Sequence, residues 1–480
     1  MGGLPKKTHS LHELRKRSKE LLAVDAGALL FKEEQLPAGQ EQQLKTTAMG
    51  IVSAYNETGF QAVGVSRQDL AAGLAFLLEV QKHSQFSWVS SNLVNKRNGK
   101  HHFAPHTLVK AGQLTVAILG LTGEGNGSIF SPEDDALILP WQQALLPQIA
   151  QVQGKADMLI LLSNYPEEEN RKIAAAHPEI HLLVQAGTRK ENMEPTLVNN
   201  TLITQVEQQG KYVALLNVSW NKTTRRWHSP EEKETLLKKK NELDRTLWLI
   251  GRHQRKGDPL TLYSDDPASM QLYKELLLQK DILVAEVKLL EDKEARKDHA
   301  AFSAFTFRFS PMNAEIPDDH KVRSLVDATT REVNSLNRKA AAAGSQDRAT
   351  ASGEDAHSGY AGSSSCTPCH AGQEKKWLKT RHARAYDTLE KREQQFNTNC
   401  VPCHVTGALA LPPAAVLRLG KELQQVGCES CHGPAGRHAS SPESQKPAQP
   451  TASACLNCHT REHDDNFDFA TDLARLNCGN

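Results

Sequence analysis

Four copies of the pattern Cys-x-x-Cys-His lie in the last quarter of the chain. They are CTPCH (366–370), CVPCH (400–404), CESCH (428–432) and CLNCH (455–459). Two cysteines three positions apart can form thioethers with the two vinyl groups of one porphyrin, and the next histidine can ligate its iron from the same turn. One copy could arise by chance, but four within 94 residues predict four covalently attached haem c groups.

The predicted attachment set has twelve members, and its histidines are the expected proximal ligands of the haem irons. The set is Cys366, Cys369, His370, Cys400, Cys403, His404, Cys428, Cys431, His432, Cys455, Cys458 and His459. Four further histidines in 357–480 are candidate distal ligands: His357, His382, His438 and His463. Eight histidines suffice for two axial ligands on each of four irons. A haem closed by two histidines has no open site for substrate, so full pairing favours electron transfer, and no catalytic residue is predicted.

Other uses of these residues must be weighed against haem attachment. Paired C-x-x-C knuckles can bind zinc, but a zinc site does not need a histidine after every second cysteine. A disulfide framework also leaves the histidines unexplained. Each histidine outside the motifs could be an ordinary exposed side chain. The ninth cysteine, Cys478, has no motif partner and is either a free thiol or an intermolecular contact.

Bulk composition excludes some partner classes. With 57 basic and 56 acidic residues the formal charge is +1, so the balance of charge does not indicate a nucleic-acid partner. No apolar run approaches 18 residues, so no transmembrane helix is predicted. All nine cysteines lie between Cys366 and Cys478, which suggests that two different units are joined.

The elements ahead of the motifs fit a layered α/β domain. Short apolar runs alternate with helical patterns over about 20–220, and continuous apolar strands imply burial on both faces. The runs are 21–27, 61–65, 87–94, 113–121, 157–163, 180–187 and 211–220. The segment 166–178 between two of them indicates a crossover helix.

Two long helices with similar apolar stripes follow this region. A capping box at Ser229 opens a helix to about Arg255, and a second helix begins at Asp266. Their stripes are Leu236, Leu243, Leu247 and Ile250, and Leu276, Leu283, Val287 and Leu290. We expect an antiparallel hairpin that acts as a spacer or dimerisation arm. A strand at 304–309 and a helix near 318–340 precede a linker of low complexity.

The motif region resembles the tetrahaem cytochrome family whose best-known member accepts electrons from hydroxylamine oxidoreductase. The resemblance covers roughly 357–465 and includes WLKTRHARA, CVPCHVTG and GCESCHGPAGRH. It implies a haem cluster with mostly bis-histidine ligation, with His382 and His438 as distal ligands. One haem in that family can be five-coordinate, which leaves a redox-catalytic role open.

The front of the chain, about 2–220, resembles the calcineurin-like metallophosphoesterase domain of periplasmic 5′-nucleotidases. LLAVDAGALL sits where that family has a strand ending in D-x-G-D, and VGVSRQDLAAG where it has G-N-H-E-x-D-x-x-G. The family binds two metal ions that activate water against a phosphoester. Here its ligand positions hold Ala28, Val65, Ser66, Asn164, Gly187 and Arg189. Alanine, valine and glycine side chains cannot coordinate a metal, so hydrolase activity is not expected.

The expected fold class is therefore α/β: a layered αββα metallophosphoesterase-like sandwich, a helical hairpin insert, and a mostly helical and irregular tetrahaem cytochrome c segment. The expected domains are 1–228 (degenerate phosphoesterase-like), 229–340 (hairpin region), 341–358 (linker) and 359–480 (tetrahaem cytochrome c). Because the family's first strand and any leader sequence are missing, we expect Met1 to be internal to a longer natural protein.

Three functions follow as hypotheses. The first is an electron carrier, periplasmic or on the extracellular face of a bacterial cell, with an inactive phosphoesterase-like scaffold. The second is an oxidoreductase with one five-coordinate haem that acts on a small nitrogen or sulfur compound. The third is a 5′-nucleotidase-like hydrolase, which the substituted ligand positions argue against. Expected partners are redox proteins, above all other multihaem cytochromes, and a second copy of the chain bound through the hairpin.

Overall fold

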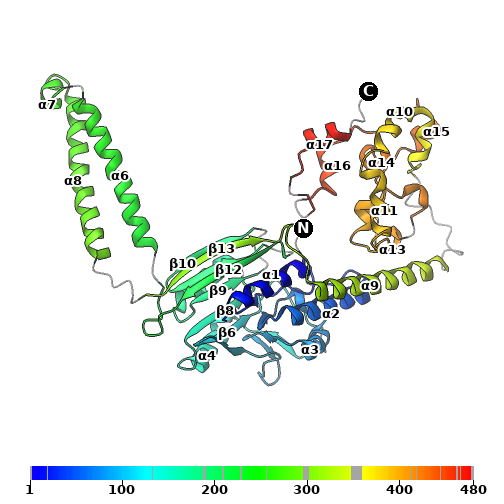
Figure 1. The fold of residues 1–480 in the computed structure, drawn as a ribbon, viewed down its shortest axis with the longest axis horizontal. Coiled ribbons are helices and arrows are strands. Elements are labelled where there is room, and N and C mark those ends of the chain that lie inside the picture. Colours follow the sequence, from blue (N-terminus) through cyan, green and yellow to red (C-terminus); the bar gives the residue numbers. More distant parts are fainter. Residues whose placement is uncertain are drawn as a thin grey trace.

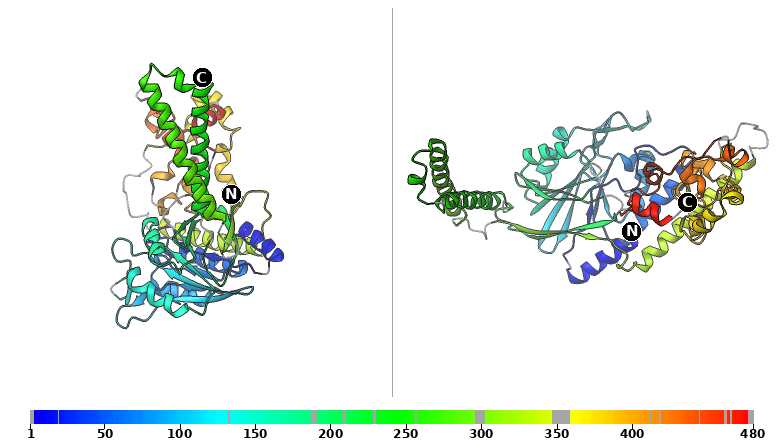
Figure 2. Two further views of the ribbon diagram at one scale, coloured as in Figure 1. Left: turned by 90° about the vertical axis from the view of Figure 1, so that its left-hand side faces the viewer. Right: turned by 90° about the horizontal axis from the view of Figure 1, so that it is seen from above.

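The computed structural model describes residues 3–476 except 19, 132, 187–190, 208–209, 228–229, 256, 296–301, 347–358, 412, 418, 444, 461–462 and 465. The structure has three parts: an α/β body, a projecting helical hairpin, and a segment of short helices (Figure 1). The hairpin and the short-helix segment lie at opposite ends of the body, as the view from above also shows (Figure 2).

The first sheet of the body has three short parallel strands. They are β1 (Val24–Asp25), β2 (Ala62–Gly64) and β3 (Ser87–Val89). The helices α1 (Leu4–Arg17), α2 (Glu41–Thr58) and α3 (Leu74–His83) pack on this sheet through a core that includes Tyr55, Leu77 and Trp88. A short turn of 3-10 helix, η1 (Gln68–Leu70), follows β2.

The second sheet has six strands in the order β10-β11-β9-β8-β6-β5. They are β5 (His106–Ala111), β6 (Leu114–Leu121), β8 (Met158–Ser163), β9 (Leu182–Gln185), β10 (Met193–Val198) and β11 (Thr201–Gln205). The helices α4 (Trp141–Val152) and α5 (Glu167–Ala176) share a core with it. The predicted crossover helix is α5, and β8 and β9 on either side of it pair in parallel.

A third core joins the two sheets. It holds Ala62 and Val89 of the first sheet and Ile118, Ile160 and Leu202 of the second. Helices therefore cover the outer face of each sheet while the inner faces pack together, which is the αββα sandwich that the sequence predicted. Every one of the seven predicted apolar runs contains a strand.

Two smaller pairings complete the body. β4 (Leu93–Asn95) pairs with β7 (Ala136–Ile138), and β12 (Tyr212–Ser219) pairs with β13 (Ala304–Pro311). After β13, α9 (His320–Gln346) packs along α2. A Cβ on Gly50 of α2 would collide with the side chain of Thr329, so glycine permits this close approach. The chain beyond the hairpin thus returns to the α/β body.

The hairpin consists of α6 (Pro230–Gln254), α7 (Pro259–Leu262) and α8 (Pro267–Ala295). The ion pair Lys239–Glu286 and the hydrogen bond from Gln254 to Tyr273 show that α6 and α8 run antiparallel, as predicted. The predicted stripe holds for Ile250, Leu276, Leu283 and Val287, which are buried. It is wrong for Leu247, which is exposed, because Thr246 occupies the inner face at that turn.

The last part of the chain is mostly helical and irregular, as expected. Its elements are η5 (Ser363–Ser365), α10 (Thr367–Trp377), η6 (His382–Arg384), α11 (Ala385–Glu390), α12 (Val401–His404), η7 (Ala408–Ala410), α13 (Pro413–Val416), η8 (Lys421–Leu423), α14 (Cys428–His432), α15 (Gly436–Ser440), α16 (Ala452–Leu456) and α17 (Phe469–Leu476). Its largest apolar cluster centres on six buried side chains, including Leu389, Val401 and Leu423. Along the described chain, no helix combines the length and apolarity needed to cross a bilayer.

Candidate functional site

Each Cys-x-x-Cys-His motif is built on one tight turn. The backbone N–H of His370 donates to the carbonyl of Cys366 at 2.9 Å, and His459 donates to Cys455 in the same way. In the second motif Cys403 donates to Cys400 at 3.2 Å. A turn of this kind brings both sulfurs and the imidazole of one motif together, which is the arrangement that a covalently attached porphyrin requires.

The motifs also lie close to one another in pairs. The thiol of Cys366 in the first motif is hydrogen-bonded to Cys428 in the third. Cys403 in the second motif is hydrogen-bonded to Cys458 in the fourth, and this contact lowers the pKa of Cys403 and raises that of Cys458. None of the eight motif cysteines is joined to another in a disulfide.

Two predicted distal histidines lie opposite motif histidines. The ring centroids of His370 and His438 are 6.3 Å apart, and those of His382 and His459 are 6.0 Å apart. Two metal–nitrogen bonds of about 2 Å, together with the two ring radii, place the centroids of paired axial imidazoles roughly 6 Å apart. Burial lowers the pKa of His382, which favours the neutral imidazole that can bind a metal.

Hydrogen bonds to backbone carbonyls fix the orientation of three of these imidazoles. Nδ1 of His404 lies 2.7 Å from the carbonyl oxygen of Ala385, and Nδ1 of His432 lies 2.8 Å from that of Ala448. Nδ1 of His438 lies 3.0 Å from the carbonyl oxygen of Gln445. A carbonyl only accepts, so Nδ1 must carry the proton and Nε2 is left with its lone pair for a metal. The residues therefore fit the haem that the motifs predict.

His459 differs from the others because its Nδ1 partner is charged. It donates to the carboxylate Oδ2 of Asp464 at 2.8 Å, and this hydrogen bond lowers the pKa of Asp464. The ring of His459 also stacks on Phe467 at 4.7 Å. Carboxylate partners of this kind raise the basicity of a metal-bound imidazole.

Replacing Asp464 with asparagine is expected to raise the reduction potential of the haem predicted at His459, by on the order of 50 mV. Loss of the carboxylate makes the imidazole a weaker donor and so destabilises the ferric iron. Spectroelectrochemical titration measures the change. Asp468→Asn is the matched control, because Asp468 is an exposed carboxylate that caps α17 through Thr471. Equal shifts in the two variants would contradict a specific role for Asp464.

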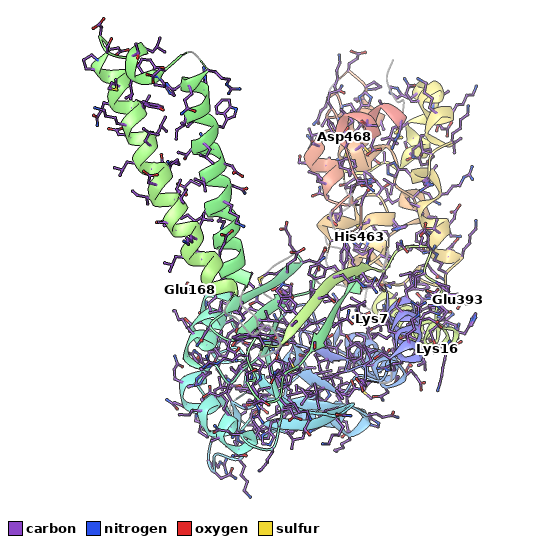
Figure 3. All side chains as sticks on the ribbon, turned by 60° about the vertical axis from the view of Figure 1, so that its left-hand side comes forward. Lys7, Lys16, Glu168, Glu393, His463 and Asp468 are labelled. Atoms are coloured by element: carbon purple, nitrogen blue, oxygen red, sulfur yellow. The ribbon has the colours of Figure 1, made fainter. Side chains whose placement is uncertain are left out.

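The remaining predicted residues are less well placed. His357 and Cys478 lie outside the described residues. His463 is exposed, and within the described chain no ring contact pairs it with a motif histidine. Figure 3 places His463 nearer the α/β body than Asp468.

One buried carboxylate in the segment had no signal in the sequence. Glu429 occupies a variable position of the third motif and is only 2 % exposed. It accepts hydrogen bonds from the backbone N–H groups of Ala361, Gly362 and Ala435 at 2.8–3.1 Å. It therefore ties the start of the segment to the third motif.

Polar contacts dock the segment on the α/β body just ahead of the second motif. Asn337 of α9 donates to the carbonyl of Phe396 at 2.8 Å, and the N–H of Phe396 donates to Asn334 at 2.9 Å. Thr398 accepts from Gln43 of α2 at 3.2 Å. Thr398, Asn337 and Gln43 are all buried, so this contact is a packed interface rather than a surface touch.

The positions that the phosphoesterase resemblance singled out come together at the carboxyl ends of β1, β2 and β8. The amide of Asn164 donates to the carbonyl of Ala26 at 2.7 Å, and the N–H of Ala28 donates to Ser66 at 3.0 Å. A Cβ on Gly27, which has φ +109°, would lie 2.5 Å from the carbonyl oxygen of Gly64. Gly187 and Arg189 lie outside the described residues.

Asp69 holds the residues at these strand ends together through hydrogen bonds. Its buried carboxylate accepts from the N–H groups of Ala28, Leu29 and Leu30 and from both the N–H and the hydroxyl of Ser66. Burial raises the pKa of Asp69, and the hydrogen bonds oppose that rise. Ala28 is held at φ +57°, a conformation that non-glycine residues seldom adopt. Within the described chain, no group of three His, Cys, Asp or Glu side chains is arranged to hold a metal ion.

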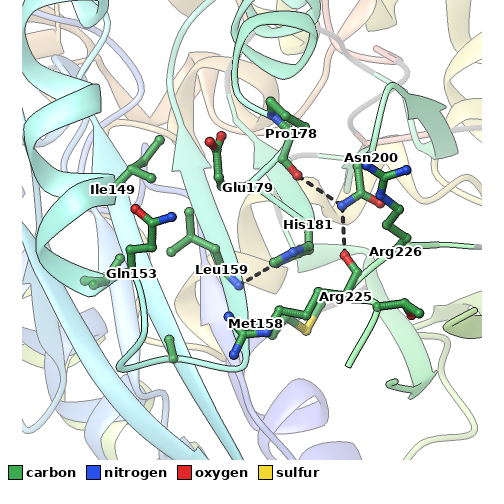
Figure 4. Close-up of a pocket in the computed structure, with 13 residues that line it drawn as sticks. Ile149, Gln153, Met158, Leu159, Pro178, Glu179, His181, Asn200, Arg225 and Arg226 are labelled. Atoms are coloured by element: carbon green, nitrogen blue, oxygen red, sulfur yellow. Dashed lines mark hydrogen bonds between the residues drawn. The ribbon is translucent and has the colours of Figure 1, made fainter. Parts of the chain in front are cut away.

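A cavity of about 280 Å³ lies near the amino ends of β8 and β9 (Figure 4). Its wall includes Met158, Leu159, Arg225 and the buried side chain of His181, which is 6 % exposed. Nδ1 of His181 accepts from the N–H of Leu159 at 2.9 Å, and the ring packs edge-on against Trp220. Burial lowers the pKa of His181 to about 4.

Acid is therefore expected to destabilise the α/β body through His181. Between pH 6.5 and 4 the unfolded chain binds a proton that the folded chain does not, so the free energy of unfolding falls as the pH falls. The loss between pH 7 and 5 is about 2 kcal/mol. Urea unfolding followed by tryptophan fluorescence at both pH values measures it. His181→Asn, which keeps an acceptor for Leu159, should reduce this pH dependence, and an unchanged dependence would contradict the account.

The two ends of the chain are similar to different known proteins. Residues 365–433 match the family described as cytochrome c554 and c-prime. Cytochrome c-554 of Nitrosomonas europaea is 32% identical over 90 residues, which are 16% of this chain and 38% of that protein.

The α/β body has different relatives. The uncharacterized metallophosphoesterase YunD of Bacillus subtilis is 25% identical over 148 residues, which are 30% of this chain and 31% of that protein. Protein UshA of Escherichia coli is 25% identical over 177 residues, which are 35% of this chain and 32% of that protein. Each match spans only about a third of the relative's own length. The chain thus joins a domain similar to metallophosphoesterases and 5′-nucleotidases to a cytochrome c554-type segment, and the latter implies covalently bound c-type haem.

Proposed function

We propose that this protein is a four-haem c-type cytochrome that transfers electrons outside the cytoplasm. The observation that carries the proposal is the placement of His438 opposite His370 and of His382 opposite His459, each pair at a separation suited to one iron. When bound, haem iron supplies one-electron chemistry between its ferric and ferrous states. The polypeptide supplies the attachment thiols, the axial imidazoles and the hydrogen bonds that orient them.

In this proposal each Cys-x-x-Cys-His motif attaches one haem and supplies its proximal ligand. His438 closes the haem of the first motif, and His382 closes the haem of the fourth. His357 and His463 remain the candidates for distal ligands at His404 and His432. Two haems closed by histidines on both sides cannot bind a substrate at iron, so their function is electron exchange.

The α/β body serves as a scaffold rather than a hydrolase. Asp69, Ser66 and Asn164 lie where the resemblance expects metal ligands. Their side chains form hydrogen bonds to other residues of the chain, and this supports a scaffold role. Further support comes from the buried contact of α9 and α2 with 396–398, two residues ahead of Cys400. The partners we propose are other redox proteins, in the periplasm or at the extracellular face of a bacterial cell.

A second function deserves a test because His404 and His432 have no histidine opposite them within the described chain. A haem left five-coordinate there could act on a small nitrogen or sulfur compound. Carbon monoxide added to the reduced protein separates the two functions, because it binds only an open iron. An unchanged Soret band supports the electron carrier, and a shifted band in a fraction of the haems supports the oxidoreductase.

A further inference from the structure

Helix α8 is apolar on two opposite faces, and only one of them is covered. Tyr273, Leu276, Leu283 and Val287 are buried on the side of α6. On the other side, Leu278 is 63 % exposed, Ile282 51 % and Leu289 56 %. The inner stripe explains the hairpin itself, but the outer stripe has no partner among the described residues.

The exposed apolar side chains are concentrated here. Among the described residues, nine of the fifteen large apolar side chains that are exposed lie between Leu247 and Leu289. The hairpin projects clear of the α/β body, so its outer face is open to solvent (Figure 1 and Figure 2). Isolated exposed leucines are ordinary, but a continuous apolar stripe on a projecting element marks an interaction surface.

The spacing of the outer stripe is that of a coiled-coil seam. Leu278, Ile282, Ala285 and Leu289 follow one another at intervals of four, three and four residues, and Ala285 is also exposed. Such a seam fits a second helix with the same repeat. The α8 helix of another copy of this chain has a matching seam.

The charges that flank the seam select its direction. In a parallel pair, Asp281 would lie beside Glu286 of the partner subunit, and two like charges would meet. In an antiparallel pair centred between Leu283 and Val284, Asp281 lies beside Lys288 of the partner subunit, and two-fold symmetry makes this ion pair twice. The same register sets Ile282 against Ala285 of the partner subunit and Leu278 against Leu289 of the partner subunit, which is good packing of large against small and large against large.

We propose that two chains associate through an antiparallel coiled-coil contact of their α8 helices, formed by Leu278, Ile282, Ala285 and Leu289. The pairing is isologous, so it closes as a dimer and leaves no half-site free for further growth. It places the α/β body of each chain near the hairpin tip of its partner, and the two haem segments at opposite ends of the assembly.

Sedimentation of the intact haem-loaded chain over a range of concentrations tests the proposal. The natural protein is expected to be dimeric at micromolar concentration. Leu278→Glu combined with Ile282→Glu should weaken the dimer at least about 100-fold, because two charges would enter an apolar seam. Leu146→Glu is the matched control, since Leu146 is equally exposed but lies on α4, and it should leave the dimer unchanged.

Exchanging the charges of Asp281 and Lys288 distinguishes loss of the dimer from loss of the fold. Asp281→Lys alone is expected to weaken the dimer about tenfold, because two attractive contacts become repulsive, and Lys288→Asp alone should do the same. The double variant restores opposite charges and should return to within about threefold of the natural protein. A natural protein that stays monomeric at roughly 100 μM overturns the proposal. The proposal is also overturned if the dimer of the variant that combines Asp281→Lys with Lys288→Asp is weaker than the dimers of both single variants. Binding of the chain to lipid vesicles through the seam, in place of a second copy, overturns it as well.

Discussion

Replacing His382 with alanine is expected to open one haem of the protein to external ligands. His382 lies 6.0 Å from His459 between ring centroids, and no other histidine ring among the described residues contacts His459. Loss of the imidazole should convert about one haem in four from low spin to high spin. Electron paramagnetic resonance of the oxidised protein and carbon monoxide binding to the reduced protein both measure the change.

Arg381→Ala is the control for His382. Arg381 is the preceding residue and is exposed, so its loss disturbs the same turn without removing a ligand. The spin state of this variant should match that of the natural protein. If His382→Ala also keeps all its haems low spin, then His382 is not an axial ligand and the pairing with His459 is wrong.

Replacing Glu429 with alanine is expected to destabilise the haem segment by about 3 kcal/mol or more. The change would leave the buried N–H groups of Ala361, Gly362 and Ala435 without an acceptor, and each unsatisfied buried group costs about 1–3 kcal/mol. The midpoint of thermal unfolding, followed by circular dichroism in the Soret region, measures the loss. A lower yield of matured protein should accompany it.

Glu390→Ala is the comparison for Glu429, because Glu390 is an exposed carboxylate in the same segment. Its removal should change the free energy of unfolding by no more than about 0.5 kcal/mol. Equal stability of the Glu429→Ala and Glu390→Ala proteins would show that the buried carboxylate does not hold the segment together.

The sequence predicted the layers of the fold because they depend on local patterns. Continuous apolar runs located the strands, and the capping box and leucine stripes located the hairpin. It could not predict that β13 would pair with β12 from the far side of the hairpin, with Ala304 opposite Ser219. It also could not predict that α9 would return to α2. Both depend on contacts between residues far apart in the chain.

The candidate site likewise has residues that the sequence predicts and residues that it does not. Attachment cysteines and proximal histidines are readable because one short motif contains the whole local geometry. Which distal histidine faces which motif is not readable, since His438 lies 68 residues after His370 and His382 lies 77 residues before His459. Glu429 and Asp464 were missed because a lone carboxylate near a motif has no distinctive spacing. Their roles appear only when the backbone donors and the imidazole beside them are located.

The central claim is that a porphyrin is attached at every Cys-x-x-Cys-His motif and gripped by the adjacent imidazole. The most direct test is the haem content of the intact chain after expression with the c-type maturation machinery, from the pyridine haemochrome spectrum and the mass of the denatured protein. The account predicts four haems per chain that stay bound after denaturation. Colourless protein, or protein that carries zinc in place of iron, would contradict it.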